Sequence, residues 1–228
     1  SGETGEVIQN DPKAIDDFLK QRPFKQYIHT HWDEKKWRLH RWLYCRLTEQ
    51  VDRQTGMVLE ALEESQELEN TIVIFTSDHG DMDGAHRMEH KSVFYDQAIR
   101  VPFIVTQKGK TVSRIDSEHI VNNGLDLFPT LCDYAGIAPP EGLLGASVKP
   151  LVEGKKPDQW REDCLIESEL GWYLITKCWK YCSLDVDGNE EALYNIAEDP
   201  DEVNNLATDP TYKNTLDKCR NKLAENRK

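Results

Sequence analysis

The chain has 228 residues, of which 28 are Lys or Arg and 41 are Asp or Glu, so its formal net charge at pH 7 is −13. This length suits one large domain, or one domain with a small appendage. The acidity argues against nucleic acid as a partner, because proteins that bind it normally carry a basic surface. No apolar run approaches the roughly 18 residues that cross a bilayer, so no membrane span is expected. The six cysteines form no Cys-x-x-Cys pair, and we interpret them as small buried thiols, with a disulfide as the alternative.

The first part of the chain divides at residue 33. Residues 1–32 are polar, contain two proline breakers, and predict an irregular segment with at most a short helix from Asp11. From residue 33 onward, apolar side chains recur every three or four positions, which predicts one long amphipathic helix ending before Asn70.

The next segment is typical of an α/β fold. Residues 71–76 are continuously β-branched or aromatic, which predicts a strand buried on both faces. Similar patterns predict strands at residues 101–105 and near 119–121, followed by a helix over residues 126–135 with Asp126 as its N-cap. We therefore expect residues 33–140 to form part of a mostly parallel sheet flanked by helices.

Residues 141–228 have a different composition. Four short runs of strand-forming residues are separated by tight connections at Gly171 and at residues 187–189. A final amphipathic stretch covers residues 210–223. This pattern predicts a small antiparallel sheet with a terminal helix.

The segment from Ser77 to Lys91 carries most of the chemistry. It follows the first predicted strand and contains three Asp, three His, one Lys and two Gly in fifteen residues. Ligands of open α/β sheets bind at the carboxyl ends of strands, where an Asp–His pair can offer two metal ligands and Gly80 permits a close turn. The alternative is that Asp78 caps a turn and that the histidines are solvated.

Several short motifs follow one another in and around this segment. They are Ser77-Asp78-His79-Gly80, Gly84-Ala85-His86, Lys91, Tyr95-Asp96 and Arg100-Val101-Pro102. In this order they resemble the pattern of the sulfatase family, within the alkaline phosphatase superfamily: a buried strand, Ser-Asp-(Asn or His)-Gly, Gly-x-His, a Lys, an aromatic–acid pair and Arg-Val-Pro. Further landmarks of the family match residues 126–131, 145–154, 191–195 and 199–206.

The resemblance implies roles for individual residues. Asp78 and His79 match ligands of a divalent cation, usually calcium, and Lys91 matches the lysine that contacts the sulfate group. His86 and His90 lie close by in sequence, so His86 is a candidate for proton transfer and His90 for substrate contact. A divalent ion and an ammonium group together stabilise the charge of a transferring sulfuryl group. Because calcium prefers oxygen ligands, a histidine at position 79 leaves the identity of the ion open.

The nucleophile of the family is absent from this sequence. Sulfatases use a formylglycine made from the Cys, or less often the Ser, of a Cys/Ser-x-Pro-x-Arg motif in the N-terminal half of the fold, and no Cys or Ser here begins such a motif. We therefore expect the C-terminal portion of a sulfatase, inactive alone because the covalent step needs its nucleophile. Its uncovered edges would pair with a companion N-terminal portion or with a second copy.

Three functions remain open at this stage. The first is hydrolysis of a sulfate ester, with a sulfated carbohydrate as the expected substrate. The second is hydrolysis of a phosphoester or phosphonate by the same superfamily, and the third is a non-catalytic binding module that keeps the fold. The family is typical of periplasmic, secreted or lysosomal compartments, but the sequence itself does not decide the compartment.

Overall fold

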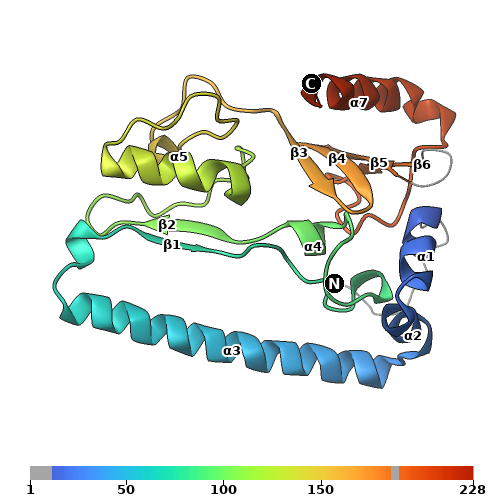
Figure 1. The fold of residues 1–228 in the computed structure, drawn as a ribbon, viewed down its shortest axis with the longest axis horizontal. Helices are drawn as coiled ribbons and strands as arrows, with labels where there is room; N and C mark the ends of the chain where they lie inside the picture. Colours follow the sequence, from blue (N-terminus) through green and yellow to red (C-terminus); the bar gives the residue numbers. More distant parts are fainter. Residues whose placement is uncertain (1–11, 186–189, 228) are drawn as a thin grey trace. The chain divides into compact units, whose positions relative to one another are not determined.

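The computed structural model describes residues 12–185 and 190–227 (Figure 1). The chain forms two compact units, each assembled from separate stretches of sequence. Unit 1 comprises the described residues of Ser1–Cys45, His79–Arg100 and Asp163–Lys228, and unit 2 comprises Arg46–Asp78 and Val101–Glu162. The division into segments 33–140 and 141–228 stays a prediction. No helix of the described ranges is long and apolar enough to cross a membrane.

Unit 1 contains the antiparallel sheet that the sequence predicts. Four strands follow one another in the order β3-β4-β5-β6, each antiparallel to the next. The connection at residues 187–189 lies outside the described residues. The strands are β3 (Asp163–Ser168), β4 (Gly171–Thr176), β5 (Trp179–Leu184) and β6 (Glu190–Asn195).

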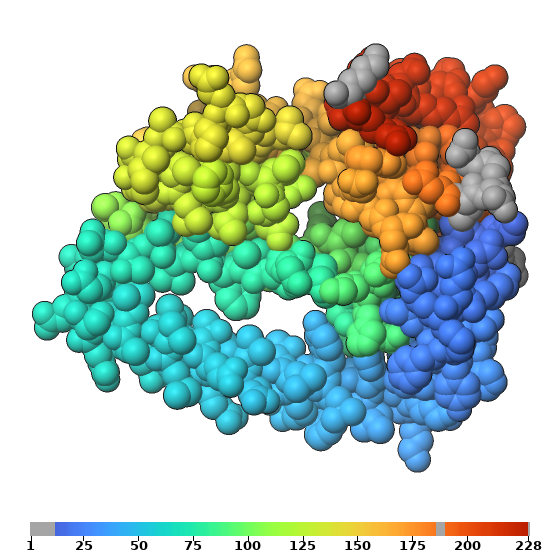
Figure 2. Space-filling model, viewed as in Figure 1, coloured from blue at the N-terminus to red at the C-terminus, as the bar shows by residue number. Residues whose placement is uncertain are grey.

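Helices and a long loop cover the two faces of this sheet. On one face, α7 (Lys213–Asn226) packs Leu216 and Leu223 against Leu174. Figure 2 shows α7 in red lying over the orange strands. On the other face, Tyr173 packs against α1 and against the loop that follows residue 79. Because neighbouring residues of a strand point to opposite faces, this alternation fixes which residues contact the loop.

The expectation of an irregular segment over residues 1–32 is wrong for its described part. The chain forms α1 (Lys13–Lys20) and α2 (Pro23–His31), while Asp11 lies outside the described residues. The apolar residues of α1 share one face and are buried in unit 1. The carboxylate of Glu190 accepts hydrogen bonds from Lys13 N at 2.7 Å and Ala14 N at 2.8 Å, so a distant residue caps this helix.

The two strands of unit 2 confirm the predicted positions but not the predicted direction. β1 (Val73–Thr76) and β2 (Phe103–Thr106) pair antiparallel. A parallel pair needs a crossover connection, usually a full helix, and the only α-helix between these strands is the single turn α4 (Asp96–Ile99). Phe75 and Ile104 are 40% and 56% exposed, so burial on both faces is also wrong for the described structure.

The third predicted strand, near residues 119–121, is absent from the described structure. The Asp116 carboxylate accepts hydrogen bonds from Glu118 N at 3.0 Å and His119 N at 3.1 Å. The carbonyl of Ile120 accepts one from the Trp160 indole at 2.8 Å. These side chains form hydrogen bonds with the backbone groups that would otherwise pair with a neighbouring strand.

The predicted helices form, with one cap assigned to the wrong residue. α3 (Glu34–Glu64) is the long helix, and a single turn η1 (Leu68–Asn70) follows it. α5 (Asn123–Ala135) is capped by Asn122, whose side chain accepts from Leu125 N at 3.1 Å, and not by Asp126. The remaining short helices are η2 (Ala85–Arg87), α6 (Lys149–Val152) and η3 (Pro210–Tyr212). All six cysteines are free thiols, and four of them are buried.

Candidate functional site

The loop over residues 79–95, here called the site loop, leaves β1 through a turn that only glycine can make. Gly80 N donates to the carbonyl of Ala98 at 2.8 Å. A Cβ at position 80 would lie 2.0 Å from the carbonyl oxygen of Gln97, well inside contact distance. The close approach that the sequence predicts for Gly80 is therefore present.

The site loop holds an unusual backbone. Five of its non-glycine residues have a positive φ, a conformation that L-residues adopt at a cost and that clusters at functional sites. Backbone hydrogen bonds across the loop hold it, including Met82 N to His90 O at 2.7 Å and Gly84 N to Met88 O at 2.9 Å. The five residues are Asp83, His86, Arg87, His90 and Ser92.

His79 and Lys91 lie in contact within unit 1. Nδ1 of His79 lies 2.7 Å from the carbonyl of Gly80, and because a carbonyl only accepts, Nδ1 carries the proton. The lone pair is then on Nε2, which contacts Nζ of Lys91. Ligating histidines usually donate their other ring nitrogen to an oxygen, as Nδ1 does here, whereas a metal ion bound to Nε2 would take the place that Lys91 Nζ holds in this structure.

Asp78 and His79, the two predicted metal ligands, are neighbours in sequence but belong to different units, Asp78 to unit 2 and His79 to unit 1. Asp78 is exposed, and its carboxylate lies 3.3 Å from the hydroxyl of Ser77. In the described ranges no three His, Cys, Asp or Glu side chains lie close enough to hold an ion. A carboxylate and an imidazole are by their chemistry able to bind a divalent cation, but two ligands do not make a site, so the metal role of these residues stays a prediction.

His86 is held as a neutral imidazole. Its ring stacks on Tyr95, with centroids 3.5 Å apart and an interplanar angle of 18°. Its Nε2 lies 3.0 Å from the carbonyl of Asp201, which accepts the ring N–H and leaves the lone pair on Nδ1. Burial lowers the pKa of His86 to about 4, against the smaller opposing influence of Asp201.

His90 is placed among carboxylates. Its side chain is 65% exposed, with Nε2 2.8 Å from Glu89 and Nδ1 3.7 Å from Asp81. Glu89 is itself buried and pairs with Lys25 Nζ at 3.5 Å. Two acidic neighbours do not favour an anionic substrate at this ring, so substrate contact by His90 stays a prediction.

Sequence reasoning missed the residues that anchor the site loop. Arg87 donates to the carbonyls of His29 at 3.0 Å and Trp32 at 2.9 Å, which ties the loop to the end of α2. Lys25, also on α2, lines a small pocket together with Lys91 and Glu89. The sequence of residues 23–32 did not reveal that this segment anchors the loop or that Lys25 lines a pocket, because the partner residues lie more than fifty positions away.

Acid titration of stability offers a test of the neutral His86. The ring is protonated in the unfolded chain below pH 6.5 but stays neutral in the folded chain down to about pH 4. Its contribution, about 2–3 kcal/mol after allowing for partial exposure, is present above pH 6.5 and lost as the pH falls to 4. Glu202 acts in the opposite sense, because burial raises its pKa to about 7 and its contribution is lost as the pH rises from 4.5 to 7.

We therefore expect opposite slopes in two variants. His86→Gln should gain stability on acidification from pH 7 to 4.5, and Glu202→Gln should lose it, as measured by urea unfolding. The free energy of unfolding of the double variant should vary least with pH. Parallel slopes in the two single variants would contradict a neutral His86.

Comparison with known proteins shows the family to which the chain belongs. A solved phosphonate monoester hydrolase of Agrobacterium radiobacter matches with a TM-score of 0.71 and 30% identity, over 78% of this chain and 39% of that one. A crystal structure from Bacteroides thetaiotaomicron, described as a candidate sulfatase, matches with a TM-score of 0.87 and 30% identity, over 99% of this chain and 52% of that one. This fold, with a polar strand-end loop, places the chain in the alkaline phosphatase superfamily.

Within that superfamily the sequence comparisons are specific. The sulfatase profile matches residues 8–137, and the profile of the C-terminal part of N-sulphoglucosamine sulphohydrolase matches residues 84–228. A Δ4,5-hexuronate-2-O-sulfatase of Bacteroides thetaiotaomicron is 35% identical over 196 residues, which is 82% of this chain and 40% of that protein. The chain belongs to the sulfatase family. It spans about half the length, or less, of these relatives.

Proposed function

We propose that this chain supplies the sulfate-binding and part of the metal-binding machinery of a sulfatase that hydrolyses sulfate esters of carbohydrates. The observation that carries the proposal is the contact between Lys91 Nζ and His79 Nε2, made by a strained loop at the end of β1. A carbohydrate substrate is supported by the relative that is named a hexuronate sulfatase.

Asp78 and His79 are the residues of this chain that would hold a divalent cation, with calcium the ion expected from the family. When bound, such an ion supplies Lewis-acid stabilisation of the sulfate oxygens. Lys91 binds the same group through its ammonium, which adds positive charge where negative charge develops. Nδ1 is the atom of His86 that would accept a proton, because Nε2 is committed to the carbonyl of Asp201, and Nδ1 is buried in the described structure.

The nucleophile and the other ligands are proposed to lie in a preceding N-terminal portion, where the family carries its formylglycine. Several large apolar side chains of α3 are exposed in the described structure, which supports a surface that this portion, or a second copy, covers. They include Leu39, Trp42, Leu47, Val51 and Val58.

Activity of the chain with and without an N-terminal portion tests this proposal. Purified residues 1–228 should release no sulfate from aryl or sugar sulfates, and the longer parent protein should release it in a calcium-dependent manner. Removing calcium with a chelator and adding it back is the control for the ion. Sulfate release by residues 1–228 alone would contradict the proposal that the nucleophile lies in an N-terminal portion.

The phosphonate monoester hydrolase among the structural relatives supports a second candidate. Sulfuryl and phosphoryl groups have a similar shape, so a divalent ion and a lysine can stabilise the charge of either group during transfer. Comparing kcat/KM of the parent protein for a sulfate ester and a phosphonate monoester with the same leaving group separates the two. A higher value for the phosphonate would favour the second candidate.

A further inference from the structure

The turn over residues 199–205, here called the C-terminal turn, matches a family landmark to which the proposed function gives no role. It follows β6 and is built as a rigid unit. The Asp199 carboxylate accepts from Asn204 N at 2.8 Å and Val203 N at 3.3 Å. Asn205 accepts from Leu193 N at 3.1 Å, which fastens the turn to the sheet.

The main contacts of this turn are made by its buried side. Glu202 has a φ of 55° and a fully buried side chain. One of its carboxylate oxygens accepts from Asp96 N at 2.7 Å, and the other contacts Lys180 Nζ. A left-handed backbone at a buried glutamate indicates that this orientation is required, since the conformation is costly for such a residue.

Lys180 extends the contact to the site loop. Its ammonium is fully buried and donates to the carbonyl of Phe94 at 3.0 Å and to Asp96 at 2.5 Å. Glu202 and Lys180 therefore hold the backbone on both sides of Tyr95, the residue whose ring lies flat against His86. A buried ion pair contributes little to net stability compared with apolar packing, so stability alone does not account for this cluster.

The same turn also contacts His86 directly. The carbonyl of Asp201, the residue before Glu202, accepts the ring N–H of His86 at 3.0 Å. Neighbouring residues of one turn thus hold the imidazole at its edge and, through Tyr95, at its face. The hydrogen bond from Nε2 to the Asp201 carbonyl determines that Nδ1 is the ring nitrogen that keeps its lone pair.

We propose that the C-terminal turn is a positioning element of the sulfatase site, which orients His86 and fixes its tautomer through the Asp201 carbonyl, with Glu202 and Lys180 holding Tyr95 beneath the ring. The functional meaning of this role rests on the proposed function. The placement of the His86 ring does not depend on the proposed function, and it can be measured without enzymatic turnover. Glu202 and Lys180 act as positioning residues and touch no substrate.

The experiment uses Glu202→Gln at pH 8, above the raised pKa of Glu202, where the carboxylate is charged; the variant keeps the size and the acceptor for Asp96 N but removes the charge that faces Lys180. Glu198→Gln is the matched control, because Glu198 is exposed, lies in the same acidic stretch and accepts a hydrogen bond from the Asn195 side chain at 2.9 Å. In the unaltered chain, nitrogen-15 spectra of histidine should show His86 protonated on Nε2 with a slowly exchanging ring proton. Glu202→Gln should shift that tautomer balance and speed the exchange, whereas Glu198→Gln should not.

In the parent protein, Glu202→Gln should lower kcat about 10- to 100-fold with little change in KM, as expected for a residue that acts through another. A His86 proton on Nδ1 in the unaltered chain would overturn the proposal even if the variant failed to fold. A lowered melting temperature with unchanged kcat and an unchanged His86 spectrum would also overturn it. If the parent protein shows no sulfatase activity, the spectra still decide the positioning role.

Discussion

Replacing Lys91 by alanine in the parent protein is expected to lower kcat by about 10²- to 10³-fold, the usual effect of removing one group that stabilises charge in the transition state. The Lys91 ammonium lies against His79 at the end of the strained loop, so its charge is held where the sulfate group is proposed to bind. Steady-state kinetics on a sulfate ester measure the effect. KM should change less than kcat, because the charge on sulfate grows most in the transition state.

Two further substitutions separate charge from packing. Lys91→Met keeps most of the side-chain volume without the charge and should be as slow as the alanine variant. Lys20→Ala removes an exposed ammonium on α1 that pairs with Asp17, and it should leave kcat unchanged. A Lys91→Met enzyme with normal kcat would show that the lysine is not part of the reaction.

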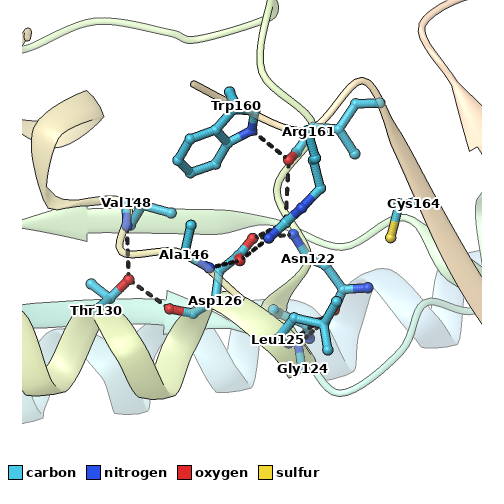
Figure 3. A network of polar contacts seen from close by, with 12 residues as sticks. Asn122, Gly124, Leu125, Asp126, Thr130, Ala146, Val148, Trp160, Arg161 and Cys164 are labelled. Carbon is cyan, nitrogen blue, oxygen red and sulfur yellow. Dashed lines mark hydrogen bonds and ion pairs between the residues drawn. The ribbon is translucent and has the colours of Figure 1, made fainter. Parts of the chain in front are cut away.

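The second large effect is expected on stability, at Asp126. Its carboxylate is fully buried and forms a two-pronged ion pair with Arg161, and it also accepts from Asn122 N at 2.8 Å and Ala146 N at 2.9 Å (Figure 3). Asp126→Ala removes all four contacts and leaves the guanidinium without its buried partner. We expect the free energy of unfolding to fall by about 3–5 kcal/mol, measured by urea denaturation.

Another acidic residue of α5 provides the control. Asp133 pairs with Lys149 at 3.1 Å, but its side chain is 39% exposed, so Asp133→Ala should cost below about 1 kcal/mol. Asp126→Leu combined with Arg161→Met should recover part of the loss, because no unpaired charge then stays buried. Equal costs at Asp126 and Asp133 would contradict the role assigned to the buried pair.

Local patterns in the sequence predicted most helices and strands. The period of α3, the β-branched run of β1, the four strands of unit 1 and the end of α5 at Ala135 all depend on residues close together in the chain. The positions of His79 and Lys91 in one polar loop followed from the same kind of local reading. Their direct contact was not expected, because it depends on how the loop bends between them.

The incorrect predictions involve distant partners. Asp126 looked like an N-cap because caps are short polar residues, yet Arg161, thirty-five positions later, uses its carboxylate in a buried pair. The contact of His86 with Asp201 spans 115 positions, and no pattern near either residue reveals it. The direction of β2 relative to β1 likewise depends on the path of the intervening chain and not on either strand.

The Glu190 cap of α1 affects the order in which the protein can fold during synthesis. The carboxylate that satisfies Lys13 N is made 177 residues after it, which takes about 9–35 s at roughly 5–20 residues per second. Until residue 190 is made, the buried face of α1, with Ile15 and Phe18, has neither its cap nor the complete sheet against which it packs, because β6 is still missing. A nascent chain paused before residue 190 should therefore expose this segment to proteases and chaperones, and completing β6 should protect it.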